Sequence, residues 1–166
     1  MVSEFGLGVN DPKLQTDLFS RHRAEWQQSA VSDALIGLNV LSLSGRTALD
    51  YLFYSDKLPR RNDGRVAESI YKRYRILENH GGWWVSGVDV LTGEDSEWGQ
   101  YKSDKPRVDR DRGKSIKYEA PPKVPTEIVA LKVPFALWKQ ISRRFGVSIL
   151  SRGAGGREQG AIFLTR

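Results

Sequence analysis

Residues 81–103, GGWWVSGVDVLTGEDSEWGQYKS, set the architecture that we predict for this chain. Residues 83–90 are rich in tryptophan and valine, which favour β-strands. Residues 92–95, TGED, have the composition of a turn, and residues 97–103 return to strand-like residues. We therefore predict an antiparallel β-hairpin, and the elements on either side of it decide the fold class.

Helices are predicted before the hairpin. The first begins at Asp11 and Pro12, a cap followed by a residue suited to the first helical turn. Its apolar stripe recurs every four residues: Leu14, Leu18, His22, Trp26 and Ala30. We expect His22 to be a partly buried residue at the edge of the core. Further helices are predicted at 33–39, 44–54 and 66–79, with 40–43 as a brief extended link.

After the hairpin, residues 115–119 and 127–133 are predicted as a third and a fourth strand, and 135–145 as a helix with Trp138, Ile141 and Phe145 facing inward. N-terminal helices, a small and mainly antiparallel sheet and a C-terminal helix make up an α+β fold. We expect a flexible N-terminus (1–10), a single α+β domain (11–146) and a loose glycine-rich tail (147–166).

The composition of the chain excludes several classes of protein. The chain has 166 residues, a net charge of +6 and no cysteine, which excludes disulfides and thiolate-bound zinc or iron–sulfur sites. Neither a secretory signal nor a membrane-spanning run is visible in the sequence. We expect a cytoplasmic protein that binds no cofactor and does not enter a membrane.

Basic residues are concentrated in three blocks, 57–75, 102–124 and 139–166. The first two are separated by residues 76–101, which contain acidic residues but neither lysine nor arginine. A positive surface assembled from distant segments is typical of proteins that bind polyanions, above all nucleic acid. A merely solvated, solubilising surface remains the alternative.

Candidate catalytic residues are few. The chain has two histidines, His22 and His80, and no recognisable nucleophile turn or phosphate-binding loop. Asp109 and Asp111 form a D-x-D pattern, but they lie in a probable loop beside arginines and not at the end of an apolar strand. A small metal-dependent nuclease is therefore the weakest alternative, and we expect no catalytic residue and no bound metal.

Single strands are held by cations that follow the phosphates and by flat side chains on which bases stack. Because adjacent strand residues face opposite ways, one of Trp83 and Trp84 should be buried and the other available. The candidate nucleic-acid-binding residues are Arg60, Arg61, Arg65, Lys72, Arg73, Trp84, Lys102, Lys105, Arg107, Lys114, Lys117, Tyr118 and Lys123.

Three segments carry a resemblance to known proteins: LPRRNDGR at 58–65, YKRYRILENHGGWWVSGVD at 71–89 and GKSIKYEAPP at 113–122. Residues 22–145 resemble the N-terminal region of bacterial plasmid- and phage-type replication proteins of the primase–helicase kind. In those proteins this region precedes a Toprim-like domain of poorly defined function, often followed by a helicase. Lys117, Tyr118 and a following proline are also similar to the basic subdomain of DnaG-type primases.

The resemblance implies a non-catalytic module that binds single-stranded DNA, with a Toprim or helicase partner encoded nearby. The Toprim acids are expected beyond residue 166, so this chain alone should not synthesise primers. The sequence departs from the family pattern at Ala120, where a histidine is usual. A protein–protein adaptor that uses GGWW and exposed aromatic residues as its contact is the alternative. The resemblance implies that Lys117 faces nucleic acid. The alternative is that Lys117 points to solvent, and alternation along the strand then turns Ile116 and Tyr118 towards the core.

Overall fold

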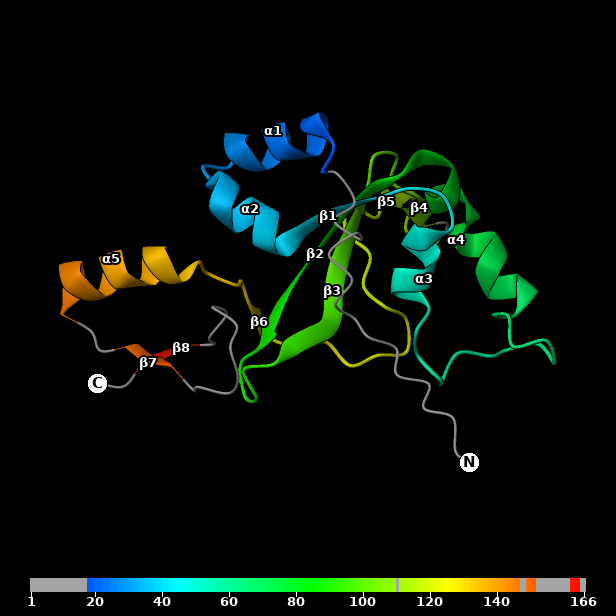
Figure 1. Cartoon of the computed structure of the whole chain (residues 1–166). Helices are drawn as coiled ribbons and strands as arrows, with labels where there is room; N and C mark the ends of the chain where they lie inside the picture. Colours follow the sequence, from blue (N-terminus) through cyan, green and yellow to red (C-terminus); the bar gives the residue numbers. More distant parts are fainter. Residues whose placement is uncertain (1–17, 110, 147–148, 152–161, 165–166) are drawn as a thin grey trace, which may run out of the picture.

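A computed structural model describes residues 18–109, 111–146, 149–151 and 162–164. The expected flexible N-terminus and the expected helix start at Asp11 lie outside the described residues. The described chain is an α+β fold in which helices surround a small antiparallel sheet (Figure 1). In this described part, no helix is both long and apolar enough to cross a membrane.

The sheet is built on the hairpin that the sequence predicts. Its strands are β1 (Val40–Leu43), β2 (Gly82–Asp89) and β3 (Asp95–Ser103), paired in that order with β2 in the centre. A short strand, β6 (Val129–Ala130), pairs with the end of β2. The hairpin and the extended link at 40–43 are thus confirmed, and β2 receives partners on both sides.

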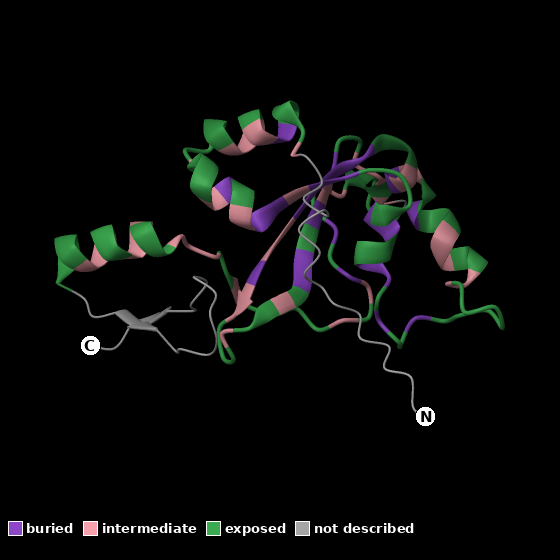
Figure 2. Ribbon diagram, viewed as in Figure 1, coloured by how far each residue is buried: buried purple, intermediate pink, exposed green. Residues whose placement is uncertain are grey.

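Helices cover both faces of this sheet. They are α1 (Ser20–Gln28), α2 (Asp33–Asn39), α3 (Thr47–Leu52) and α4 (Glu68–His80). On one face, Trp84 packs in a cluster with Leu52 of α3 and Leu77 of α4. On the other, Trp83 packs with Ile36 of α2, and Trp26 of α1 lies against this cluster. We call these the Trp84 face and the Trp83 face, and Figure 2 shows buried residues along the strands between them.

Two glycines of the hairpin let backbone and rings approach closely. A Cβ atom at Gly99 would lie 2.4 Å from the Val85 carbonyl oxygen and 2.5 Å from Cζ2 of Trp84. At Gly82 it would lie 2.2 Å from the Lys102 carbonyl oxygen. Since real Cβ atoms do not come so near, both positions require glycine, and these contacts fix how the aromatic side chains of the Trp84 face pack.

The N-terminal helices largely follow the sequence prediction. The second helix was predicted with the bounds of α2, and α4 ends at Gly81, whose φ of 65° is a conformation that favours glycine. The first helix begins only at Ser20, so the prediction that Leu18 is helical is wrong. Leu18 instead precedes the helix and packs against the Trp83 cluster.

The C-terminal half departs further. Of the third strand predicted at 115–119, only Ser115 belongs to a strand, β5 (Lys114–Ser115), which pairs with β4 (Val108–Asp109). The predicted fourth strand is reduced to β6. α5 (Phe135–Phe145) has the predicted bounds, but none of its residues is buried. The prediction that Phe145 faces inward is wrong, since it is exposed, while Trp138 and Ile141 are half-buried. Where a loose tail was expected, β7 (Ile149–Ser151) pairs with β8 (Ile162–Leu164).

Candidate nucleic-acid interface

The segment after β5 returns to the edge of β3. Tyr101 and Glu119 form an isolated antiparallel bridge, with N–O distances of 2.9 and 2.8 Å between their backbones. Because neighbouring residues of an extended chain face opposite ways, Glu119 lies on the Trp84 face and Tyr118 on the Trp83 face. This bridge therefore determines which face of the sheet Tyr118 and Glu119 occupy.

Tyr118 lies beside two lysines and the buried ring of Trp83. Tyr118 is 42% exposed, and its ring centroid lies 5.9 Å from that of Trp83. Lys117 Nζ lies 5.3 Å from the centroid of Tyr118, and Lys102 Nζ lies 5.8 Å from that of Trp83. We call Lys102, Lys117, Tyr118 and the adjoining edge of Trp83 the aromatic–lysine platform. The expectation that Tyr118 packs in the core is wrong.

The two lysines of the platform differ in their partners. Lys102 forms an ion pair with Glu25, and Glu25 also accepts a hydrogen bond from Trp83 Nε1 at 3.0 Å. Burial opposes ionisation of Glu25, but the hydrogen bonds from Lys102 and Trp83 prevail and lower the pKa of this carboxyl group. Lys117 has no ion-pair partner among the described residues. Lys117 is thus the more available cation of the platform.

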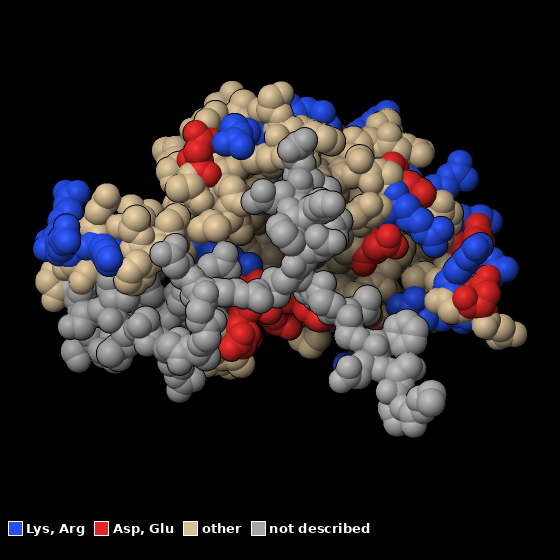
Figure 3. All heavy atoms as spheres, in the orientation of Figure 1, with Lys and Arg blue, Asp and Glu red and all other residues tan. Residues whose placement is uncertain are grey.

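Other predicted cations are exposed elsewhere on the described surface. Lys105 lies between β3 and β4, Lys114 belongs to β5, and Lys72 and Arg73 lie on the outer side of α4. Figure 3 shows many Lys and Arg side chains over α3, α4 and the loop before α4, with acidic side chains among them. Since α4 covers the Trp84 face, these helix cations do not join the platform in one continuous groove.

Some predicted contact residues are structural. Trp84 is only 3% exposed, because helices cover both faces of the sheet and leave neither tryptophan available. The prediction that one of the pair is free for a base is therefore wrong, and Trp84 cannot serve as a stacking surface. Arg107 pairs with the buried carboxylate of Glu119 and its guanidinium lies 4.6 Å from the Tyr74 ring centroid. Burial raises the pKa of Glu119, while the hydrogen bonds from Arg107 oppose that rise.

The remaining predicted residues are divided between loops. Lys123 is exposed in a backbone conformation with φ of 66°, and its carbonyl oxygen accepts a hydrogen bond from Ser55 Oγ. Arg60, Arg61 and Arg65 do not approach the platform; they line a separate pocket between α3 and α4. Arg46 lines the same pocket and was not singled out from the sequence, because it lies outside the basic blocks.

A serine–histidine–aspartate trio is present that no local sequence pattern indicates. His22 Nδ1 lies 2.7 Å from Ser42 Oγ, and His22 Nε2 lies 2.9 Å from Asp104 Oδ1. These residues are 20 and 82 positions apart. Ser42 is buried and its oxygen already accepts the Phe19 amide N–H at 2.9 Å, so a substrate has no route to it. The trio instead attaches α1 to β1 and to the end of β3, and His22 is fully buried where partial burial was expected.

The acidic D-x-D pattern lies in a turn. Asp109 Oδ1 accepts hydrogen bonds from the backbone amides of Asp111 and Arg112 at 3.0 and 3.2 Å. This carboxylate therefore stabilises the turn between β4 and β5. Within the described residues, no group of three or more His, Cys, Asp or Glu side chains is placed to hold a metal ion.

This chain is similar to part of a much longer protein. Over 130 residues, 77% of its length, this chain is 51% identical to an uncharacterized protein of Picosynechococcus sp.. The matched stretch covers only 13% of that protein. No family model matches the chain. No solved structure matches it.

Proposed function

We propose that this chain is a non-catalytic module that binds single-stranded nucleic acid, with single-stranded DNA favoured, through the aromatic–lysine platform. The observation that carries the proposal is the exposed ring of Tyr118, with Lys117 above it and Trp83 beside it. A base that stacks on Tyr118 would bring its phosphate within reach of Lys117. Ring and cation at one place are what single-strand binding requires.

Exposed lysines near Lys117 in the sequence add positive charge for a nucleic-acid backbone. Lys105 and Lys114 are exposed on the same stretch of chain as Lys117. Lys102 contributes less, because Glu25 compensates its charge. Such a surface offers phosphate contacts without a base-reading helix, so we expect weak binding with little sequence preference.

The wider role that we propose is in a primase–helicase-like replication system in the cytoplasm. The resemblance of residues 22–145 to the N-terminal region of plasmid and phage replication proteins favours this role. The match to a small part of a longer relative favours a module within a larger protein and says nothing of its activity. Both are typical of a module that works beside other domains. A Toprim or helicase protein encoded nearby is the proposed partner.

Fluorescence anisotropy with a labelled single-stranded oligonucleotide tests the platform. Tyr118→Ala should weaken binding about tenfold, since stacking of one base contributes roughly 1–3 kcal/mol. Lys117→Gln should reduce the slope of log affinity against log salt by about 0.7, the value for one phosphate contact on a single strand. Absence of binding by the parent protein at about 50 mM salt would contradict the proposal.

α5 offers a matched control. Lys139 Nζ lies 4.6 Å from the centroid of Phe135, which is also partly exposed, so this helical pair places a lysine near an aromatic ring as Lys117 and Tyr118 do. Lys139→Gln and Phe135→Ala should leave the affinity for the oligonucleotide unchanged. Equal losses at both places would mean that binding depends on charge in general and not on the platform.

A docking module is the second candidate, and α5 favours it. Phe135 and Phe145 are exposed on this helix, and Leu131 is exposed just before it. The contact predicted at GGWW is wrong, because both tryptophans are buried. Binding of a Toprim or helicase partner through α5 would show a shallow salt dependence and would be weakened by Phe145→Ser, with oligonucleotide binding unchanged.

A further inference from the structure

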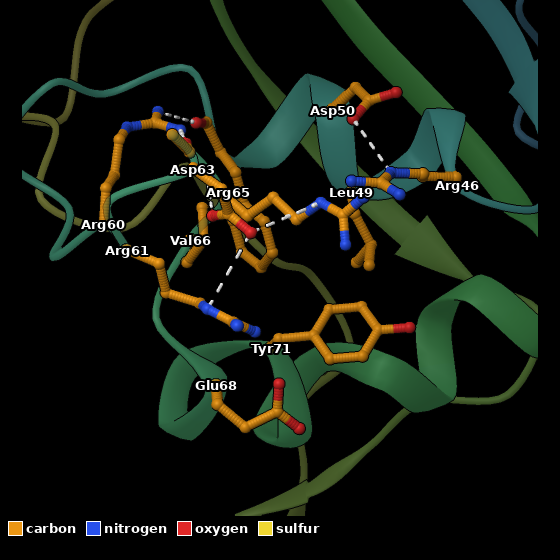
Figure 4. A pocket seen from close by; sticks show the side chains of 12 residues that line it. Arg46, Leu49, Asp50, Arg60, Arg61, Asp63, Arg65, Val66, Glu68 and Tyr71 are labelled. Atoms are coloured by element: carbon orange, nitrogen blue, oxygen red, sulfur yellow. Dashed lines mark hydrogen bonds and ion pairs between the residues drawn. The ribbon is translucent and has the colours of Figure 1, made fainter.

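A pocket of about 610 Å³ lies between α3 and α4, on the Trp84 face of the sheet. Its side chains come from α3, from the loop before α4 and from the first turns of α4, as Figure 4 shows. This volume is within the range of roughly 300–1,000 Å³ that is usual for small-molecule sites. The platform lies on the other face, so the pocket is a separate feature of the molecule.

Arg60 builds the wall of this pocket. Its Nη2 donates to the carbonyl oxygens of Phe53 and Ser55 at 2.9 and 3.3 Å, and its Nη1 donates to that of Gly64 at 3.0 Å. These hydrogen bonds occupy the end of the guanidinium and hold the loop against the end of α3. Arg60 therefore gives the pocket its shape and has little capacity left for a ligand.

Arg46, Arg61 and Arg65 are arranged differently. Their recorded side-chain contacts are ion pairs at 4.0, 4.0 and 3.9 Å, and in each the nitrogen nearest to the acid is Nε. No hydrogen bond or ion pair of their Nη atoms is recorded with the described residues. The three side chains are 66%, 56% and 68% exposed. The donor ends of these guanidinium groups are thus free to take an anion.

Asp63 orients two of these arginines without filling the pocket. Its Oδ1 accepts the backbone N–H of Arg65 at 3.1 Å and so belongs to the turn. Its Oδ2 lies between the Nε atoms of Arg61 and Arg65 (Figure 4). Because the Asp63 carboxylate lies on the Nε side of the Arg61 and Arg65 guanidinium groups, their Nη atoms are turned away from it. This is the side with which arginine binds phosphate oxygens in pairs.

The rest of the lining combines two carboxylates, Asp50 paired with Arg46 and Glu68 paired with Lys72, with flat or apolar side chains. Leu49, Phe53 and Val66 belong to, or pack against, the cluster beneath the Trp84 face. The Tyr71 ring lies at the pocket, and its hydroxyl donates to Glu78 Oε2 at 2.6 Å, which holds the ring in place. The hydrogen bond to Glu78 also raises the pKa of Tyr71, so the ring stays neutral. Guanidinium groups and a fixed aromatic ring thus line one pocket, a combination that suits a phosphate joined to a base.

We propose that this pocket binds a nucleoside phosphomonoester, with the phosphate held by Arg46, Arg61 and Arg65 and the base placed against Tyr71. The phosphate can come from a free nucleotide or from the 5′ end of a nucleic-acid strand, and both present the same dianion beside a base. The proposal does not depend on the platform, because its residues and its face of the sheet are different.

Isothermal titration calorimetry of the full chain with adenosine 5′-monophosphate tests the site. Adenosine and inorganic phosphate, titrated separately, should each bind at least tenfold more weakly than the nucleotide. Arg61→Gln and Arg65→Gln should each lower the affinity for the nucleotide about tenfold. Arg143→Gln, a matched change of an exposed arginine on α5, should leave it unchanged. Tyr71→Leu should lower affinity for the nucleotide, while Tyr71→Phe, which retains the ring, should not.

Competition identifies the source of the phosphate. An oligonucleotide that displaces the nucleotide only when it carries a 5′-phosphate assigns the pocket to strand ends. Failure of both oligonucleotides to displace it assigns the pocket to free nucleotides. No binding of the nucleotide, binding no tighter than that of adenosine or of phosphate, or unchanged binding in Arg61→Gln with Arg65→Gln would overturn the proposal. Loss of oligonucleotide binding in Tyr118→Ala leaves these outcomes unaffected, so the two proposals fail separately.

Discussion

Arg107 and Glu119 form a bidentate ion pair beneath the returning segment. Arg107 Nε lies 2.6 Å from Glu119 Oε1, and Arg107 Nη2 lies 2.9 Å from Oε2. Glu119 is buried, and the guanidinium also covers the ring of Tyr74 on α4. The pair therefore attaches the segment that carries Lys117 to the helical layer on the opposite face.

Glu119→Gln should destabilise the fold by about 3 kcal/mol, because it leaves the charge of Arg107 without its partner in a largely buried place. Urea unfolding followed by tryptophan fluorescence measures this. Arg23→Gln, which removes the exposed pair with Asp33, is the control and should cost less than about 1 kcal/mol. The double change Arg107→Met with Glu119→Leu should be less harmful than Glu119→Gln. Equal destabilisation by the control and by Glu119→Gln would contradict a structural role.

Asp104 should make stability depend on pH. Burial opposes its ionisation, but hydrogen bonds from Arg21 and His22 prevail and hold its pKa below the ordinary value of 3.8. A carboxyl with a lowered pKa in the folded state stabilises the fold above its unfolded pKa. This contribution is lost as the pH falls through the folded-state value.

The measurement is the urea midpoint between about pH 2 and 6, in the parent and in Asp104→Asn. The parent should lose stability towards the acid end more steeply than the variant. Parallel curves for the two proteins would show that Asp104 does not contribute to the acid sensitivity.

Gly99→Ala should destabilise the hairpin. The added methyl group would meet the Val85 carbonyl oxygen and the Trp84 ring at 2.4 and 2.5 Å, and overpacking of this kind costs about 1–3 kcal/mol. Gly37→Ala is the matched change, since nothing lies within 4 Å of its Cβ position and it is inside α2. It should be neutral or stabilise by up to about 1 kcal/mol. Thermal unfolding of both variants decides, and a neutral Gly99→Ala would contradict the packing described here.

Lys117→Glu should weaken binding of single-stranded DNA at low salt and leave the unfolding midpoint unchanged, because Lys117 is exposed and has no recorded ion-pair partner among the described residues. The difference from the parent should shrink as salt rises, since screening reduces the repulsion. Anisotropy titrations at several salt concentrations test this. If Lys117→Glu binds like the parent throughout, the segment is scaffold and the cations on α4 become the remaining candidates.

Local signals in the sequence predict much of the fold. The Trp-rich strand with its TGED turn gives the hairpin, and periodic apolar residues give α2 and α5 with the observed bounds. The strand predicted at 115–119 does not form along its whole length. At its end, Glu119 pairs with β3 through an isolated bridge to Tyr101, a residue outside the local sequence pattern. A short alternating pattern does not indicate how many of its residues will form backbone hydrogen bonds with another strand.

The candidate site is less predictable for a related reason. The sequence does not indicate which group a basic side chain will contact. Arg107 forms an ion pair with a buried carboxylate, and Arg60 donates hydrogen bonds to carbonyl groups. Lys117 has no ion-pair partner in the described part of the chain. Trp84 was assigned as available because alternation predicts one exposed face, whereas helices cover both. These roles arise from long-range packing, which composition and spacing do not encode.

β2 carries adjacent tryptophans into two different hydrophobic clusters. Because both clusters share this strand, neither helical layer can separate from the sheet without exposing an indole ring to water. The two layers are therefore expected to unfold in one cooperative transition and not as independent halves. The amides at the centre of β2 should accordingly exchange their hydrogens most slowly, at a rate governed by global unfolding.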